Sequence, residues 1–145
     1  MKLNAKRLIT LLFAIVFLST FAFQIAIYAD SAERDQTRNN NTSYTDTSFS
    51  ISTSGMASVK VKYEGYANVT TGATIEITIK KRFLLVFWTT EIEEEYTVYG
   101  TDYDHTYYYD LTEFGSGTYK CLVTYTVSGS GGADDVIPFE DTASW

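Results

Sequence analysis

Apolar and polar residues alternate with a period of two along most of the chain, and no helical period of 3.6 follows residue 30. In three segments every second residue is apolar and the residues between are mostly polar. These segments are 57–64, 74–80 and 119–127. Weaker forms of the pattern occupy 48–52, 92–99, 104–111 and 134–140. A strand with one buried and one solvated face has this pattern, so the sequence predicts seven strands.

Turn-forming residues separate the predicted strands. Glycine, with serine, threonine or aspartate beside it, occurs at 71–72, 100–102, 115–117 and 128–132. Strands that follow one another at intervals of about 8–15 residues, with such turns between them, are typical of an antiparallel β-sandwich. The predicted fold class is therefore all-β, with the sandwich spanning residues 47–145.

The segment from Leu111 to Cys121 has the clearest local signature. Tyr119 stands two residues before Cys121 and follows a glycine-rich turn. In immunoglobulin-like (Ig-like) sandwiches a tyrosine at this place bonds back to the preceding backbone and fixes the corner between two strands. The segment resembles that corner, although the chain has no second cysteine for a cross-sheet disulfide and has Gly115 where an aspartate is usual. Tyr119 and Cys121 are thus expected to be buried structural residues, with an unreactive thiol at Cys121.

A longer series of features covers most of residues 55–135. It consists of an isoleucine-alternating strand that ends in Lys80 and Lys81, a tryptophan at Trp88, a Gly-Thr-Tyr-Lys motif at 117–120 and a closing Gly-Gly hairpin. This order is similar to that of small uncharacterised exported bacterial proteins with a single Ig-like domain. The resemblance implies an Ig-like β-sandwich and export, and it brings no catalytic residue with it.

The first thirty residues indicate where the protein works. A basic start at residues 2–7 precedes an apolar run of 16 residues at 8–23, and Ala29 offers a small residue for cleavage. This is the layout of a secretory signal peptide, and the run is short for a membrane span, which needs about 20 apolar residues. We therefore expect a signal peptide at 1–29 and a secreted, extracellular protein. Membrane contact is expected only through this leader, before cleavage.

Cleavage after Ala29 would leave a strongly acidic chain. The leader contains three of the eleven Lys and Arg and none of the eighteen Asp and Glu, so eight basic and eighteen acidic residues remain, a net charge of −10. Such a charge argues against nucleic acid and against anionic membrane surfaces as partners. The residues that follow the leader, 30–46, are polar and are expected to form a disordered spacer.

Residues 83–88 interrupt the alternation with six consecutive apolar residues, after a basic run at 80–82 and before an acidic run. One interpretation is a hairpin between two strands, with Trp88 turned into the core. The other is an exposed apolar loop that docks into a partner or a lipid surface. A two-faced sheet cannot bury all six side chains, so at least two of three candidates are expected to be exposed and to form a contact surface. The candidates are Phe83, Leu85 and Phe87.

Four tyrosines surround the only histidine, His105. A flat aromatic surface of this kind can stack against sugar rings, and Tyr103 and Tyr108 are the candidate sugar-binding residues. The alternative is ordinary packing, since tyrosine suits a half-wet sheet face. The alternation places Tyr107 and Tyr109 on the side of Leu111 and leaves Tyr108 outside.

Patterns for catalysis and metal binding are missing from the sequence. His105 has no nucleophile in its sequence context, and no G-x-S-x-G, H-E-x-x-H or phosphate-binding glycine loop occurs. Aspartates at 102, 104 and 110, or at 134 and 135, are oxygen donors of the kind that calcium prefers, but they match no calcium-binding pattern. A single cysteine cannot build a zinc site. We therefore expect no enzyme activity, no cofactor and no metal site.

Three functions remain open at this point. The leading expectation is a non-catalytic binding module, secreted or associated with the cell surface, whose partner is a protein or glycan there. The first alternative is a carbohydrate-binding module that uses the tyrosine-rich face. The second is a small secreted toxin or bacteriocin-like effector that acts through residues 83–88. A weak homodimer through the same segment is a further expectation.

Overall fold

The computed structural model describes residues 39–84 and 86–145, which form seven β-strands and one short 3-10 helix. The elements are β1 (Thr42–Ile51), β2 (Met56–Gly65), β3 (Thr70–Phe83), β4 (Phe87–Tyr99), β5 (Asp102–Asp110), η1 (Thr112–Phe114), β6 (Thr118–Gly129) and β7 (Asp135–Ser144). Each of the seven predicted strands is present. The expected signal peptide at 1–29 lies outside the described residues, and so does Leu85.

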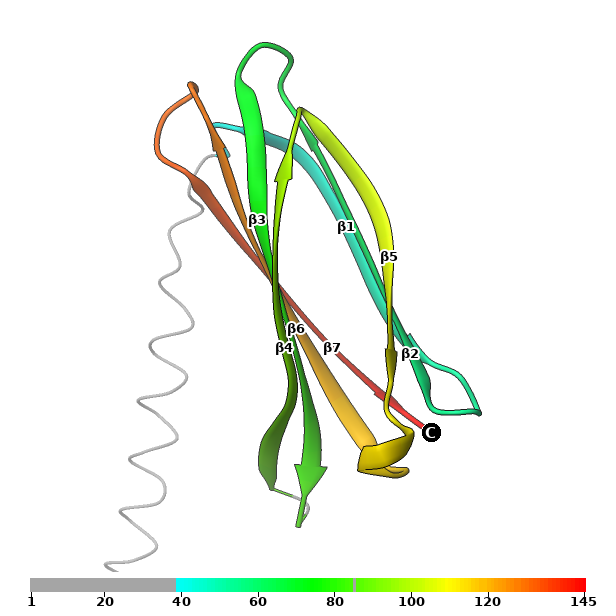
Figure 1. Ribbon diagram of the computed structural model, residues 1–145. Coiled ribbons are helices and arrows are strands. Elements are labelled where there is room, and N and C mark those ends of the chain that lie inside the picture. Colours follow the sequence, from blue (N-terminus) through cyan, green and yellow to red (C-terminus); the bar gives the residue numbers. More distant parts are fainter. Residues whose placement is uncertain (1–38, 85) are drawn as a thin grey trace, which may run out of the picture. The chain divides into compact units, whose positions relative to one another are not determined.

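The strands form two antiparallel sheets (Figure 1). One sheet has three strands in the order β1-β2-β5, and the other has four in the order β4-β3-β6-β7. The chain crosses from one sheet to the other after β2, after β4 and after β5. The prediction of an all-β fold with antiparallel sheets is confirmed.

The inward faces of both sheets meet in one hydrophobic core. Most of the fully buried side chains come from the three strands with strict alternation, each of which is central in its sheet. They include Val59, Val61 and Tyr63 of β2, Ile75, Ile77 and Ile79 of β3, and Cys121, Val123 and Tyr125 of β6. Residues Arg38–Trp145 form one compact unit that contains this whole core. All the core residues that the structure describes therefore lie within this unit.

The corner before β6 has the contact that the sequence predicts. Tyr119 is fully buried, and its hydroxyl donates a hydrogen bond to the carbonyl of Gly115. Gly115 has a φ of +76°, a left-handed conformation that glycine adopts without steric cost. Cys121 is buried, and removal from water raises the pKa of its thiol to about 12. The predicted burial of both side chains is confirmed.

Regular structure begins earlier than predicted. β1 starts at Thr42, inside the segment 30–46 that was expected to be a disordered spacer, so that expectation is wrong from Thr42 on. The backbone N–H of Asn41 donates to the carboxylate of Asp135 at 2.7 Å, and the Asn41 side chain is fully buried. Polar contacts of this kind hold the start of β1, and a hydrophobic pattern cannot reveal them.

In the described part of the chain no helix has the length and hydrophobicity of a membrane span.

Candidate functional site

The hairpin between β3 and β4 ends in an exposed apolar turn. We call its described residues, Phe83, Leu84, Val86 and Phe87, the tip. Phe83 and Phe87 pair with each other at the ends of the two strands and are 56% and 62% exposed, while Leu84 and Val86 are 68% and 70% exposed. Figure 1 shows this hairpin at the end of the molecule where η1 and the C-terminus lie. The prediction that at least two of the candidates are exposed is confirmed for Phe83 and Phe87.

Leu84 has a backbone conformation that leucine does not favour. Its φ is +47°, in the left-handed region, which costs a residue other than glycine roughly 1–2 kcal/mol. Asparagine or glycine is the usual choice there. Because the side chain is also mostly exposed, neither burial nor backbone preference accounts for a leucine at this position. The composition of the tip is therefore not explained by folding.

Trp88 lies outside the core, so the expectation that it turns inward is wrong. The register between β3 and β4 shifts beside Lys80, where Glu91 of β4 is an extra residue without a partner of its own. Such a bulge moves the residues beyond it to the opposite face of the sheet. Trp88 is thus half-buried on the outer face, with the Lys120 ammonium nitrogen 4.8 Å from its ring centroid.

Basic side chains gather behind the tip. Three of them directly precede Phe83, the last residue of β3, and the fourth, Lys120 of β6, is the register partner of Lys80. We call this set, Lys80, Lys81, Arg82 and Lys120, the basic collar. It contains four of the six Lys and Arg among the described residues. Lys120 is ion-paired with Glu140 at 2.5 Å. The described part of the chain therefore has four of its six Lys and Arg side chains near the end of this hairpin, three on β3 and one on the neighbouring strand β6.

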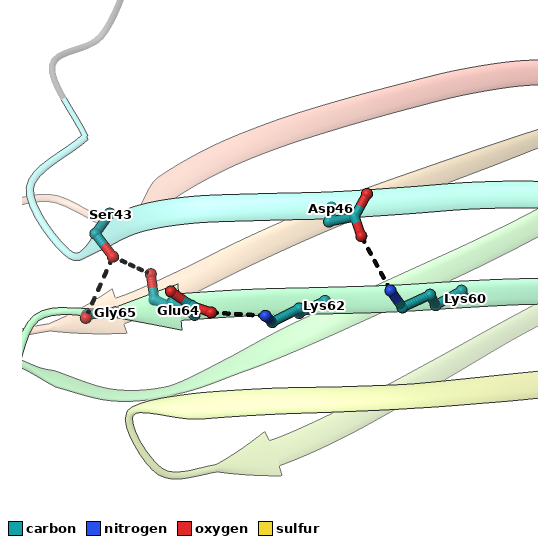
Figure 2. Close-up of polar contacts among 6 residues, drawn as sticks. All are labelled: Ser43, Asp46, Lys60, Lys62, Glu64 and Gly65. Atoms are coloured by element: carbon teal, nitrogen blue, oxygen red, sulfur yellow. Dashed lines mark hydrogen bonds and ion pairs between the residues drawn. The ribbon is translucent and has the colours of Figure 1, made fainter.

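The other two described cations lie on the outer face of the three-stranded sheet (Figure 2). Lys60 is 3.0 Å from a carboxylate oxygen of Asp46, and Lys62 is 2.7 Å from one of Glu64. These hydrogen bonds raise the pKa of each lysine. The Ser43 hydroxyl donates to the backbone carbonyl of Glu64 at 2.8 Å and ties β1 to β2. Both cations are thus paired with acids of their own sheet.

Lys81, on the opposite face of β3 from Lys80, fixes the hairpin to η1. Its ammonium group donates to the backbone carbonyl of Phe114 and lies 5.8 Å from the ring centroid of Tyr119. This contact connects the root of the tip with the buried corner before β6. The strand ends that carry the tip are therefore held in place by a contact with the rest of the domain.

The tyrosines of β5 divide between its two faces. Tyr103, Tyr107 and Tyr109 are opposite the buried residues of β2 and are half-buried, whereas Tyr108 is exposed on the outer face. The predicted placement of Tyr107, Tyr108 and Tyr109 is confirmed. Because Tyr103 and Tyr108 are on opposite faces, they form no common flat surface against which a sugar could stack.

The inward tyrosines fill one side of the sandwich between the edge strands β4 and β5. Tyr96 of β4 stacks on Tyr107 with ring centroids 4.0 Å apart, and the hydroxyls of Tyr103 and Tyr107 are 2.9 Å apart. Burial raises the pKa of Tyr107 and of Tyr109 above the ordinary value. His105 packs edge-on against Tyr107, with centroids 4.7 Å apart. These contacts assign the cluster to packing.

Two of the candidate calcium ligands, Asp110 and Asp135, make structural contacts. The Asp110 carboxylate accepts hydrogen bonds from the N–H and the hydroxyl of Thr112, at 2.9 and 2.7 Å, which lower the pKa of Asp110. Asp135 holds the start of β1, as described above. In the residues that the structure describes, no group of three or more His, Cys, Asp or Glu could hold a metal ion.

Comparisons with known proteins give only a partial structural likeness. No family model and no curated protein matches the chain. The solved GH3 β-glucosidase of Bifidobacterium adolescentis is 14% identical, with a TM-score of 0.42 over 70% of this chain and 18% of that chain. A β-glucosidase from Listeria innocua, in complex with glucose, is 12% identical, with a TM-score of 0.40 over 70% of this chain and 16% of that chain. The likeness thus involves less than a fifth of those proteins, and likeness at this level does not identify a function.

Proposed function

We propose that this chain is a non-catalytic binding module, secreted or associated with the cell surface, and that the tip is its contact element. The observation that carries the proposal is the exposure of four large apolar side chains in one turn. We also propose that the sandwich is Ig-like. The sheet orders and the corner contact of Tyr119 support this type.

The argument for contact is that folding gains little from the tip. Exposed apolar surface contributes about 25 cal/mol per Å² once a partner covers it, so even a small patch can anchor the protein. A contiguous exposed apolar turn is otherwise an aggregation hazard, and charged residues beside such a segment reduce it. The basic collar on one side and the acidic run from Glu91 on the other are placed to do so.

The two alternative functions fare differently. A sugar-stacking role loses its proposed surface, because Tyr103 packs inside the sandwich edge and only Tyr108 is outside. A toxin-like role would use the same tip, so it differs from the proposed role in the effect of contact on a target cell. A growth assay with purified protein added to candidate target cells separates these two roles.

The experiment is co-sedimentation with the cell-envelope fraction of the cells that produce the protein. It uses the chain from Asp30 on, which contains the compact unit Arg38–Trp145. The test variant is Phe83→Ser/Phe87→Ser. The matched control is Tyr99→Ser/Val136→Ser, which removes two exposed apolar side chains from other parts of the surface.

We expect the unchanged chain and the control to sediment alike and the test variant to remain in the supernatant. Urea titrations of all three proteins should coincide within about 0.5 kcal/mol, the usual range for surface substitutions. Equal binding of the test and control variants would reject the tip as the contact element. Unfolding of the test variant would assign these side chains to the core.

A further inference from the structure

Charge is ordered along the β3–β4 hairpin, starting from the tip. The first three cross-strand pairs behind the tip are Arg82 with Trp88, Lys81 with Thr89, and Lys80 with Thr90. These pairs contain three cations and no acid. The first acid along this hairpin is Glu91, at the bulge. An apolar end is thus followed directly by a cationic zone.

Trp88 adds an interfacial residue to that zone. Its ring lies on the outer face beneath the Lys120 ammonium, at 4.8 Å. Tryptophan together with lysine or arginine is typical of the membrane–water interface, where an amphipathic ring and a long cationic side chain both find suitable surroundings. Among the described residues, Lys80 has no ion pair with a carboxylate, whereas the Lys81 ammonium group is held by the Phe114 carbonyl.

The rise per residue of a strand determines how far each part of the hairpin lies from the tip, and so how deep it would lie in a bilayer. At about 3.3 Å per residue, the Trp88 pair lies about 10 Å behind the turn and the Lys80 pair about 16 Å behind it. Interfacial apolar segments bury about 5–10 Å into the boundary between headgroups and acyl chains. A tip that enters to this depth would place Trp88 among the headgroups and the lysines at the phosphate layer.

Along the hairpin the acidic residues lie farther from the tip than the cations do. Glu76 lies four residues beyond Lys80, about 13 Å away along the strand, and charges are screened over about 8 Å at physiological salt. The acids nearer the collar are Glu91 and Glu93 of β4, the latter opposite Thr78 and about 7 Å along the strand from Lys80, then Glu94, Glu113 of η1, and Glu140 and Asp141 of β7. Glu140 is already paired with Lys120. Repulsion of the remaining acidic surface would instead orient the molecule with the tip toward an anionic surface.

From this arrangement we infer that the partner of the tip is an anionic lipid bilayer. The tip inserts into its interface, and the outward-facing part of the basic collar, led by Lys80, contacts lipid phosphates. The inference rests on the proposed function and names its partner. It departs from the expectation drawn from net charge alone, because the cations are concentrated at the apolar end. A symmetric tip-to-tip dimer is disfavoured, since it would bring two basic collars together.

The test is sedimentation with lipid vesicles. Vesicles of phosphatidylcholine alone are compared with vesicles that also contain phosphatidylglycerol. The protein is the chain from Asp30 on, because the apolar run at 8–23 would itself enter vesicles. Lys80→Gln removes a collar charge, and Lys60→Gln is its matched control on the face of the other sheet.

We expect binding to the vesicles that contain phosphatidylglycerol, much weaker binding to phosphatidylcholine, and loss of binding as salt is raised. Lys80→Gln should bind about fivefold more weakly, the effect of one cation near an anionic surface. Lys60→Gln should bind like the unchanged chain. The affinity of Phe83→Ser/Phe87→Ser for these vesicles should be more than about tenfold lower, because this variant has no large apolar side chains at the two positions to bury in the bilayer.

Four results would overturn the inference, the last of them together with the proposed function. The first is equal binding to both kinds of vesicle, and the second is an equal effect of Lys80→Gln and Lys60→Gln. The third is tip-dependent binding to cell envelopes without binding to vesicles, which would leave the proposed function standing with a protein as the partner. Absence of tip-dependent binding to envelopes and to vesicles alike would reject both proposals.

Discussion

Replacing Leu84 by asparagine separates what the tip contributes to folding from what it contributes to contact. The φ of +47° is costly for leucine and is tolerated by asparagine, so the exchange should recover about 1 kcal/mol of backbone strain. Leu84 is mostly exposed, and the loss of its small buried part should cost about 0.5 kcal/mol. The variant should therefore be more stable than the unchanged chain by about 0.5 kcal/mol.

Val86→Asn is the matched control. Val86 is almost equally exposed in the same turn, so we expect this exchange to lose only the small buried part of the side chain. The two variants should differ by about 1 kcal/mol. At a urea m-value of about 2 kcal/mol/M, this separates their midpoints by about 0.5 M.

The assay is a urea titration of both variants, followed by co-sedimentation with the envelope fraction. Both variants should bind more weakly than the unchanged chain, since each removes an exposed apolar side chain. If Leu84→Asn is no more stable than Val86→Asn, then leucine stabilises the turn through packing, and the argument that folding does not explain the tip is refuted.

Three further predictions concern the rest of the chain. Tyr119→Phe should lose about 1 kcal/mol in a denaturant titration, because the bond to the Gly115 carbonyl is removed, while Tyr108→Phe should lose nothing measurable; equal effects would reject the corner assignment. Cys121, whose thiol stays protonated because burial raises its pKa to about 12, should resist a thiol reagent at neutral pH until the protein unfolds, and rapid labelling of the folded protein would show that it is accessible. Mass spectrometry of protein from the medium should find an N-terminus at or near Asp30, and an intact Met1 would contradict the expected leader.

The central strands could be predicted from the sequence because they are buried on one face along their whole length. In β2, β3 and β6 the inward positions are almost all apolar, so the period of two is strict. β1 is an edge strand, and inward Thr47 meets the core through its hydroxyl, 2.6 Å from that of Tyr125. A hydrophobic pattern does not reveal such a strand, so the predicted start of the fold lies too far along the sequence.

The candidate site could be predicted only in part for a similar reason. An excess of apolar residues over what a sheet can bury indicated the exposed tip. The bulge at Glu91 leaves no signature in the alternation, yet it decides that Trp88 faces outward. Lys120 joins the collar only through the pairing of β6 with β3, which spans forty residues of sequence between Lys80 and Lys120.

The most direct test of the central claim is the environment of the tip while the protein is bound to its native surface. A fluorescent probe attached to the cysteine of Val86→Cys is compared with the same probe on Val136→Cys. Val136 is also exposed but lies on β7, away from the turn that contains Val86. Cys121 is buried and should leave the labelling specific. On binding to the envelope fraction, the probe at position 86 should become protected from an aqueous quencher while the probe at position 136 remains accessible. Equal accessibility of the two probes in the bound state would contradict the claim that the tip makes the contact.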